Sequence, residues 1–595
     1  MLIDIFRLFL GSMALFILPG IAAAYAVFPK KGEDILEKAI LALSLGISHA
    51  IFPVFIANYA LKIPINFWSV AGNSLLWTVV FTALFLYQRK KEKEPEKKEK
   101  RLMQKKPVKK EEYALLKAFG VLCAVLLSFA MVYSVHDNYR FPYHTDEWID
   151  VRISTEIMEY GSIGSGMNLE IGIALFLADL FLLSGVDPVL GYQYLPALFT
   201  AFSALTLFIA VYRMTGKYFP ALFAVLFFAG LKTNITILGL WFFVAITMCI
   251  PLLYAVFYLI SAGLEKGSAR YLLCAAYILL NIALIHPCSA SFVFPVVVVY
   301  LLLRPRLIFK NPVGLAILFS VPFLSFVYFI KHFWMGNLDK TINFFLDYIV
   351  FRINEFLPWE YYLFLPGFYG WTAIALAIAG VFSIYAYSRE KEKIFVSWGI
   401  WTLGSLYMFY NLKIILFSPY ERTIYYALLA LVPLSGIGLY QVFSWIYDLT
   451  GRLDKRVALA FCVVLSLLVY ADYYTDYNKY RSGLYTVIDE RDYSALSKLA
   501  EKGISGKKVL AKPHTSFVIY PISRNSVLAV SPRTSAPGKD AQAAERFFSG
   551  ANCTEQTAIL KAYKIDYIYS PEEITCPAIK EIYQKSGRFL YRVEL

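Results

Sequence analysis

The stretch Asn138-Tyr-Arg-Phe-Pro-Tyr-His-Thr-Asp-Glu-Trp148 is short and polar, and it follows an apolar run that ends near residue 135. It places two adjacent carboxylates, Asp146 and Glu147, beside a segment of membrane-spanning length. Ionised groups are costly at such a position and seldom serve packing. The side of the membrane that this pair faces, and the groups around it, should therefore decide both the fold and the function.

The composition is that of a polytopic membrane protein. Of the 595 residues, 58% are hydrophobic and 17% are charged, whereas a soluble protein carries about 25% charged residues. Many apolar runs reach the ~20 residues that cross a bilayer, and only helices can span it in such runs. The first run, 5–28, has Asp4 near its start and no basic segment before it, so we do not expect a cleaved signal peptide.

The net charge of +14 does not indicate a nucleic-acid partner, because much of it lies in one segment. Between Arg89 and Glu112 stand twelve Lys or Arg and six Glu, with few apolar residues to bury. This composition is typical of a disordered or fraying cytoplasmic linker, and contact with anionic lipid headgroups is the alternative. We therefore expect membrane lipids, and no nucleic acid, as partners of this chain.

Basic clusters recur along the chain, and two apolar runs separate most of them from the next. Placing every cluster in the cytoplasm satisfies the positive-inside rule and predicts about fourteen transmembrane helices, with both termini outside the cytoplasm. Three segments then lie outside: the loop 136–189, the loop 331–365 and the region from about 475. The expected spans are 5–28, 36–60, 67–87, 113–135, 190–212, 219–234, 238–261, 271–287, 288–303, 312–330, 366–388, 394–411, 423–445 and 456–474.

The chain is expected to have four parts, which are a three-helix transmembrane extension (1–88), the basic linker (89–112), a transmembrane core (113–474) and a small extracytoplasmic α/β domain (475–595). The last assignment rests on short β-type runs at 508–511, 526–530, 565–569 and 589–593, with helical stretches between them. Cys553 and Cys576 lie in this domain and could form a disulfide in an oxidising compartment.

The first outer loop is expected to contain two helices at the membrane interface. Residues 148–160 have helical spacing with one polar face, and 170–184 are apolar but short for a span. If 170–184 crossed the membrane, every later segment would be inverted and all basic clusters after residue 184 would lie outside. We therefore favour the interfacial placement.

Carboxylates at an outer membrane face can act as a general base or bind a divalent cation such as Mg²⁺ or Mn²⁺. Cations on the same face could stabilise a phosphate leaving group, so the combination suits a phosphorylated lipid donor. We predict Asp146 and Glu147 as catalytic residues, and as the metal ligands if a metal is used. Donor-phosphate contacts are predicted at Arg422, Lys232, Lys331 and His332, and substrate contacts at Arg140, His144, Asp150 and His286.

Structural explanations remain open for these residues. The two carboxylates could cap the helix that begins near Trp148. Arg422 could pair with Glu421 or another acid instead of a phosphate. His286 could hydrogen-bond a neighbouring helix, His144 could be incidental, and the cations at 331–332 could extend from a helix end toward water.

The order of these features resembles the GT-C superfamily of membrane glycosyltransferases, which includes protein O-mannosyltransferases, the aminoarabinose transferase of lipid A and oligosaccharyltransferases. The resemblance rests on the Asp146-Glu147 pair in the first outer loop of the core, on the two interfacial helices after it, and on the loop 331–365 after the seventh core span. It covers the core and the C-terminal domain. The first three spans and the linker are extra to the usual core and could dock a partner or a lipid.

The resemblance implies transfer of a sugar, with inversion, from a polyprenyl-phosphate or dolichyl-phosphate donor to a lipid, glycan or protein acceptor at the outer face of the cell membrane. It implies that Asp146 is the base or positions the acceptor, and that Glu147 supports it or assists a metal. The oligosaccharyltransferase signature Trp-Trp-Asp-Tyr-Gly does not occur in the sequence, so transfer of a whole oligosaccharide to asparagine is disfavoured.

Three other functions remain open. A polysaccharide polymerase or ligase would use a lipid-diphosphate glycan, but such enzymes usually depend on outer Arg and His residues. A lipid or glycan transporter would predict an internal repeat and broken or charged helices near the bilayer midplane. A non-catalytic scaffold would not require the Asp-Glu loop. A glycosyltransferase is the leading hypothesis.

Overall fold

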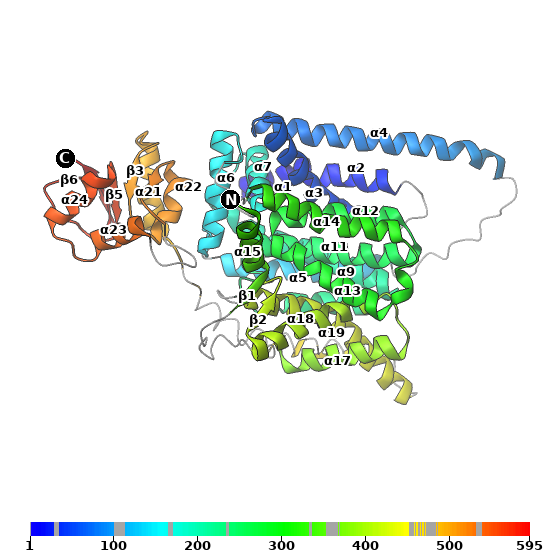
Figure 1. The fold of residues 1–595 in the computed structure, drawn as a ribbon. Coiled ribbons are helices and arrows are strands. Elements are labelled where there is room, and N and C mark those ends of the chain that lie inside the picture. Colours follow the sequence, from blue (N-terminus) through cyan, green and yellow to red (C-terminus); the bar gives the residue numbers. More distant parts are fainter. Residues whose placement is uncertain are drawn as a thin grey trace.

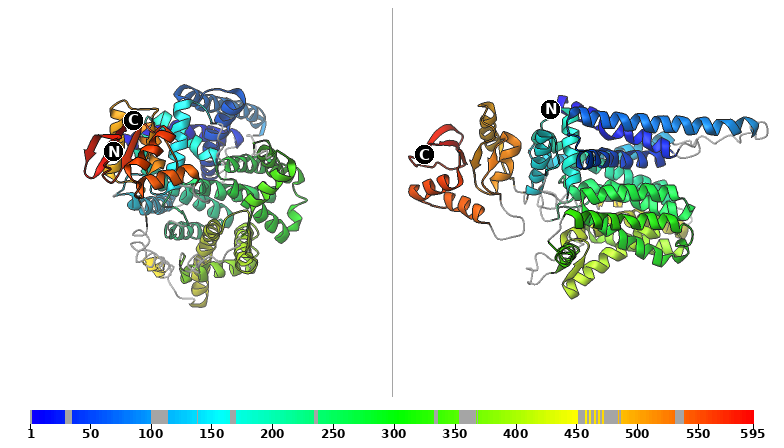
Figure 2. Two further views of the ribbon diagram at one scale, coloured as in Figure 1. Left: turned by 60° about the vertical axis from the view of Figure 1, so that its left-hand side comes forward. Right: turned by 45° about the horizontal axis from the view of Figure 1, so that its top comes forward.

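The computed structural model describes residues 2–28, 35–99, 114–137, 139–164, 170–233, 237–332, 336–352, 369–450, 486–530 and 538–595, with isolated residues at 367, 484 and between 457 and 471. A large helical bundle carries a smaller domain with a sheet at one end (Figure 1). Figure 2 shows that the bundle helices run side by side and that the C-terminal domain projects beyond their ends.

The bundle opens with α1 (Leu2–Ser12), the π-helical turn η1 (Met13–Ile17), α2 (Leu18–Val27), α3 (Ile35–Leu61) and α4 (Phe67–Glu99). The next helices are α5 (Ala114–His136), α6 (Thr145–Tyr160), α7 (Ile171–Ser184), α8 (Pro188–Gly191), η2 (Tyr192–Tyr194), α9 (Leu195–Thr215) and α10 (Tyr218–Ala229). The bundle ends with α11 (Ala245–Lys266), α12 (Ala269–Ile285), α13 (Pro287–Leu303), η3 (Pro305–Leu307), α14 (Pro312–His332), α15 (Leu338–Ile349), β1 (Val350–Arg352), α17 (Trp371–Ala386), α18 (Lys393–Leu412), β2 (Ile414–Leu416) and α19 (Tyr420–Thr450).

The helices agree with a polytopic membrane protein. Among the described residues, seven helical segments are long and apolar enough to cross a bilayer, at 3–27, 35–61, 67–90, 117–136, 188–215, 245–266 and 420–448. Six shorter apolar helices accompany them, at 171–184, 218–229, 269–285, 287–303, 312–325 and 371–386. The expected total of fourteen spans stays a prediction, because the span expected at 456–474 lies almost wholly outside the described residues.

Several basic clusters gather at one end of the bundle. Arg213 at the end of α9 and Lys266 at the end of α11 both bind Glu37 of α3, with N–O distances of 3.3 and 3.2 Å. Arg304, after α13, pairs with Glu265 and, at 2.7 Å, with Glu390 before α18. Clusters that the charge pattern assigned to one face of the membrane therefore do share one end of the bundle. Which face this is stays a prediction.

The start of the basic linker is helical, and the expectation of a disordered or fraying segment stays a prediction for the rest of it. The helix α4 continues past the apolar run through residue 99, and Figure 1 shows it projecting beyond the neighbouring helices. Lys and Glu are good helix formers, and extending an existing helix costs far less than nucleating a new one. The remainder of the linker, 100–113, lies outside the described residues.

The segment from residue 486 forms a mixed sheet with helices. Its strands are β3 (Lys508–Leu510), β4 (Ser526–Val527), β5 (Tyr567–Ser570), β6 (Ile579–Lys585) and β7 (Arg588–Val593). They lie in the order β4-β3-β5-β7-β6, with β3 parallel to β4 and β5, and with β7 antiparallel to β5 and β6. The helical segments are α21 (Glu490–Glu501), η5 (Thr515–Val518), α22 (Ile519–Ser523), α23 (Lys539–Phe548) and α24 (Cys553–Tyr563).

This domain contacts the first outer loop directly. The Tyr139 hydroxyl donates to the Ile488 carbonyl at 2.8 Å, and Arg140 pairs with Glu490 of α21 at 2.6 Å. At the other end of α6, the Tyr520 hydroxyl of α22 donates to Glu159 at 2.8 Å. The C-terminal domain is thus attached to the segment before α6 and to the last turn of α6.

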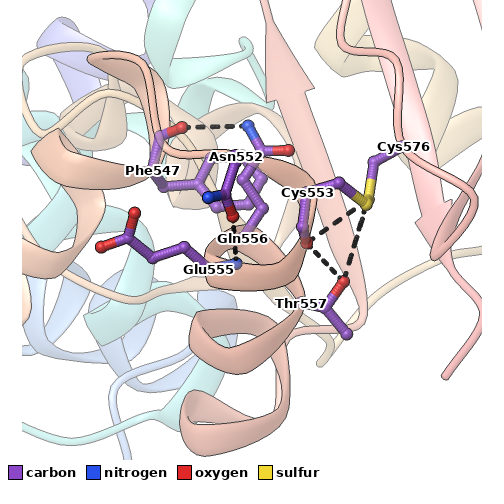
Figure 3. Close-up of a disulfide and its surroundings, with 7 residues drawn as sticks. All are labelled: Phe547, Asn552, Cys553, Glu555, Gln556, Thr557 and Cys576. Carbon is purple, nitrogen blue, oxygen red and sulfur yellow. Dashed lines mark hydrogen bonds between the residues drawn. A yellow bond between two sulfur atoms is a disulfide. The ribbon is translucent and has the colours of Figure 1, made fainter.

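Cys553 and Cys576 form a disulfide between the first turn of α24 and the chain before β6 (Figure 3). The two cysteines are 23 residues apart in the sequence. A disulfide of this kind is typical of a domain in an oxidising compartment, which agrees with the expected extracytoplasmic placement.

We expect replacement of Cys553 and Cys576 by Ser to lower the free energy of unfolding of this domain by ~3 kcal/mol, because the unfolded chain gains loop entropy. Thermal unfolding of the full chain, with and without a reductant, measures the loss. Cys123→Ser is the matched control, because Cys123 is an exposed free cysteine in α5. Equal unfolding temperatures for the double variant and the control would contradict the prediction.

Candidate active site at the N-terminus of α6

The first turn of α6 is held by a reciprocal cap. His144 occupies the N-cap in an extended conformation, and its Nδ1 accepts the backbone N–H of Asp146 at 3.1 Å. The Glu147 carboxylate bonds back to the N–H of His144 at 3.0 Å. At the other end, Gly161 terminates the helix with φ of 66°, a left-handed conformation that glycine adopts without strain. The capping explanation left open by the sequence is thus confirmed for Glu147.

Glu147 is fully buried and holds three backbone groups. Its Oε2 accepts the N–H groups of Tyr143 and His144 at 2.9 and 3.0 Å, and its Oε1 accepts the N–H of Phe243 at 2.8 Å. Burial raises the pKa of this carboxyl to about 8, although the three donated hydrogen bonds oppose that shift. This geometry makes Glu147 a positioning residue that joins α6 to a distant loop.

That loop, residues 230–244 between α10 and α11, corrects an expectation. The sequence predicted spans at 219–234 and 238–261 joined by a short turn, but α10 ends at Ala229 and α11 begins at Ala245. Its described residues from 231 onward are buried. A buried loop must find partners for its backbone polar groups, and here side chains from other segments supply them.

Four side chains fix the loop 230–244. Glu147 accepts the N–H of Phe243, and the Tyr192 hydroxyl donates to the Phe243 carbonyl. A ring nitrogen of His136, at the end of α5, lies 2.9 Å from the Trp241 carbonyl oxygen. Arg422 of α19 donates to the Ile237 carbonyl at 2.7 Å. The loop therefore connects the N-terminal turn of α6 with the N-terminal turn of α19.

This arrangement brings Asp146 and Arg422 together. Arg422 Nη2 lies 3.9 Å from Asp146 Oδ2, and His144 Nδ1 lies 3.5 Å from Asp146 Oδ1. The Asp146 and Arg422 side chains are 22% and 18% exposed, unlike the fully buried Glu147 beside them. A carboxylate and a guanidinium that both reach the surface of an otherwise buried region can contact a ligand. The alternative that Arg422 pairs with an acid other than Glu421 is confirmed, with Asp146 as that acid.

Arg422 follows a strand that pairs with residues of the loop 331–365. Strand β1, within that loop, pairs antiparallel with β2, and Phe351 lies opposite Ile415. The chain then turns and enters α19 at Tyr420, so Arg422 lies in the first helical turn. Strand β2 of this two-stranded ribbon therefore lies directly before α19 in the chain.

His286 lies in the turn between α12 and α13, where it forms a hydrogen-bonded cluster. Its Nδ1 is 2.7 Å from the Ser289 hydroxyl, which is 2.5 Å from the hydroxyl of Tyr426 on α19. Its Nε2 is 3.5 Å from Glu170. The alternative that His286 bonds neighbouring helices is confirmed, and its predicted substrate contact stays a prediction.

The other predicted residues lie at different places. Asp150 is buried one turn after Asp146 on α6, and Lys232 is buried in the loop 230–244. Arg140 faces Glu490 of the C-terminal domain, not Asp146. Lys331 lies against the ring of Tyr59 on α3, at 5.6 Å from the ring centre. His332 ends α14, and its side chain lies outside the described residues.

The geometry offers few ligands for a divalent cation. Glu147 is buried and engaged with backbone N–H groups, which leaves Asp146 and His144 as candidates at the surface. Within the described part of the chain, no group of three or more His, Cys, Asp or Glu side chains is arranged to hold a metal ion. The reaction proposed for this site therefore has no step that uses a metal ion.

Sequence reasoning missed the roles of His136, Tyr192 and the loop 230–244. His136 was hidden at the end of an apolar run, where a histidine has no characteristic spacing. One signal was present: Lys232-Thr-Asn-Ile-Thr236 is a polar interruption too wide for a tight turn between two spans.

The family comparison matches residues 193–587 to a model described as a family of unknown function, DUF6541. This match spans more than half of the chain. The chain belongs to the DUF6541 family. The matched region includes the loop 230–244, Arg422 and strands β3 to β6 of the C-terminal sheet. It begins after Asp146 and ends just before β7. No curated protein matches the sequence.

Solved structures with a similar fold include the apo oligosaccharyltransferase of Archaeoglobus fulgidus, at 13% identity and a TM-score of 0.52 over 77% of this chain and 70% of that one. The oligosaccharyltransferase AglB of that organism, with an inhibitory peptide and a dolichol-phosphate, has 12% identity and a TM-score of 0.50 over 77% and 70%. ArnT from Cupriavidus metallidurans has 14% identity and a TM-score of 0.49 over 80% and 97%.

At such low identities the oligosaccharyltransferase structures show the fold alone. That fold is the one of the GT-C membrane glycosyltransferases, so the resemblance predicted from the sequence is confirmed at the level of fold. The DUF6541 family chain is accordingly a helical membrane protein with a GT-C fold.

Proposed function

We propose that this protein is a membrane glycosyltransferase that moves a sugar from a polyprenyl-phosphate donor to a lipid, glycan or protein acceptor at the outer membrane face. The observation that carries the proposal is the approach of Arg422 to Asp146 at 3.9 Å, with both side chains partly exposed. Arg422 and Glu147, the neighbour of Asp146, both bind the buried loop 230–244. The GT-C fold supports it, as does a similar structure that holds a dolichol-phosphate.

In the proposed reaction, Asp146 accepts the proton of the acceptor hydroxyl as its oxygen attacks the anomeric carbon. The bond from that carbon to the phosphate oxygen breaks, and the lipid phosphate leaves with the bonding electrons. A single in-line displacement inverts the anomeric configuration. Arg422 neutralises the charge that builds on the leaving phosphate. Electrostatic stabilisation of this kind is usually the largest single contribution to lowering the activation barrier.

The resting pair of Asp146 and Arg422 also has a role in this proposal. Its 3.9 Å separation is too long for a hydrogen bond and too short to admit a sugar between the two groups. Donor binding would transfer Arg422 to the phosphate and release Asp146 for the acceptor. His144 caps α6, and its Nδ1 lies 3.5 Å from Asp146 Oδ1. It would hold the carboxylate in place during this exchange.

A donor panel tests the proposed function. The full chain is reconstituted in liposomes with radiolabelled polyprenyl-phosphate sugars or with a lipid-diphosphate oligosaccharide, with and without divalent cations, and transfer to endogenous lipid or protein acceptors is measured. Transfer from a monophosphate donor supports the proposal. Transfer only from the diphosphate would identify a polymerase or ligase instead, and movement of intact donor across the bilayer without transfer would identify a transporter.

With the active donor, we expect Arg422→Lys to raise the donor KM and to lower kcat/KM about tenfold to hundredfold. Lys keeps the charge but loses the planar fork that holds both the phosphate and the Ile237 carbonyl. Arg152→Lys is the matched control. Arg152 lies on α6 about two turns after Asp146, and its guanidinium pairs with Glu156 at 2.9 Å. Similar kinetics in both variants would exclude Arg422 as the phosphate ligand.

A further inference from the structure

The N-terminal helices enclose a cavity that the proposed transfer reaction does not use. Its volume is about 880 Å³, within the range of small-molecule sites, and its walls come from α2, α3, α4 and α12. Most lining side chains are apolar. Within its lining, the rings of Trp77, Phe81 and Tyr277 surround His49, with ring-centre distances of 5.5, 4.8 and 5.2 Å.

The cavity has the dimensions and the opening of a lipid-chain site. It is lined along α4 from Trp68 to Phe81, a length of ~20 Å at the rise of an α-helix. One leaflet of a bilayer core is ~15 Å deep. Trp68 and Leu76, which line the cavity, are 79% and 58% exposed, so the cavity opens on the side of the bundle that faces the bilayer.

Two cations lie near one end of the cavity, although neither is among its lining residues. Lys62 follows Leu61 and precedes Ile63, both of which line the cavity, and its Nζ is 5.5 Å from the centre of the Tyr59 ring. Lys331 arrives from α14, and its Nζ is 5.6 Å from the same centre. Lys62 and Lys331 are both exposed. Two ammonium groups that contact one ring offer a phosphate two cationic partners.

The cavity is remote from the proposed reaction centre. At the same end of the cavity, the backbone N–H of Ile65 donates to the carbonyl of Gly161 at 2.7 Å. Gly161 ends α6, whereas Asp146 lies in its first turn. The sixteen-residue helix between them is ~24 Å long, so a phosphate at Lys62 is too far from Asp146 to belong to a reacting donor.

We propose that this cavity binds an anionic phospholipid from the leaflet into which it opens. The hydrocarbon chains lie between α3, α4 and α12, and the phosphate lies between Lys62 and Lys331. The lipid fills the space between the N-terminal helices and the core. Its chains meet the aromatic rings around His49, and its phosphate connects α3 with α14. The proposal does not depend on glycosyl transfer, and it assigns the N-terminal helices a ligand.

Gly72 gives a direct means of filling this cavity. It lines the cavity from α4, and a Cβ added there would meet no atom within 4 Å. Gly72→Leu should therefore fold and occupy the volume of the lipid chains. Gly404 of α18 has equally open surroundings and does not line the cavity, so Gly404→Leu is the matched control.

The test is native mass spectrometry of the full chain in detergent, with phosphatidylglycerol or phosphatidylcholine of identical chains as probes. We expect wild type to retain phosphatidylglycerol more strongly than phosphatidylcholine. Lys62→Gln and Lys331→Gln should each weaken phosphatidylglycerol retention about fivefold. Gly72→Leu should reduce retention of both lipids, whereas Gly404→Leu should match wild type.

Two results would overturn this proposal. Equal retention of phosphatidylglycerol by wild type and Gly72→Leu would show that the lipid binds elsewhere. Displacement of phosphatidylglycerol by a polyprenyl phosphate, together with loss of sugar transfer in Gly72→Leu, would assign the cavity to the donor instead. Thermal unfolding of each variant separates loss of binding from loss of fold, and Gly404→Leu sets the reference.

Discussion

Replacement of Asp146 by Asn is expected to lower sugar transfer by a factor of about 10²–10⁴, the usual contribution of a general base. Asn keeps the size of the side chain but cannot take the acceptor proton. The reconstituted transfer assay, with the donor that the panel identifies, measures the loss. Because Asp146 is partly exposed and its backbone N–H, not its carboxylate, serves the cap of α6, the variant should fold normally.

Glu156→Gln is the control for this experiment. Glu156 is a partly exposed carboxylate on the same helix and also faces an arginine, Arg152, at 2.9 Å. An exposed pair of this kind contributes ~0–1 kcal/mol to stability, so this variant should transfer sugar at the wild-type rate. Undiminished transfer by Asp146→Asn would remove Asp146 from the chemistry and leave its pairing with Arg422 as a structural contact.

Replacement of Glu147 by Ala should have the largest effect on stability. It would leave the buried N–H groups of Tyr143, His144 and Phe243 without their acceptor. Each unsatisfied buried donor costs ~1–3 kcal/mol, so we expect a loss of at least ~3 kcal/mol. The unfolding temperature in detergent should fall, and sugar transfer should fall with it because the loop 230–244 is released.

Glu147→Gln separates the two connections that Glu147 makes. The amide oxygen can still accept from Tyr143 and His144, but the amide NH₂ then faces the N–H of Phe243. We expect an unfolding temperature between those of wild type and Glu147→Ala. If Glu147→Ala and Glu147→Gln both unfolded like wild type, Glu147 would not be the residue that holds the loop.

The same carboxyl should make stability depend on pH. Its pKa in the folded protein, about 8, lies above the ordinary 4.5, so the folded state binds this proton more tightly than the unfolded state. Its contribution is therefore complete at pH values below 4.5 and is lost as the pH rises toward 8. Glu147→Gln should flatten the stability profile across this interval, because the amide does not titrate.

Local sequence was sufficient for most helices of the bundle. Long apolar runs leave the chain no spanning structure but the helix, and the basic residues after them mark one end of each pair. The meeting of Arg213 and Lys266 at Glu37 agrees with that pattern. Placing Asp146-Glu147 at the start of a helix also needed only local residues, since carboxylates favour helix N-termini.

The loop 230–244 could not be predicted from local sequence, because its residues are as apolar as those of a span. Its path depends on partners that arrive from other segments: Glu147 binds Phe243 and Arg422 binds Ile237. For the same reason, the sequence could not show which of the predicted cations lies beside Asp146. In the sequence, Lys331, Arg140 and Arg422 all lie next to the ends of apolar runs. In the structure, Lys331 lies against Tyr59 and Arg140 pairs with Glu490.

The sequence by itself determined a polytopic helical protein and the place of the Asp-Glu pair at the start of a helix, because periodicity, run length and charge are local properties. It also predicted the resemblance to the GT-C fold, whereas the outer placement of the pair stays a prediction. Only the tertiary structure decided that Glu147 is buried as a positioning residue, that Asp146 stays at the surface, and that Arg422 is the cation beside it. These outcomes follow from backbone groups of one buried loop, which must be hydrogen-bonded by whichever side chains the fold brings to them.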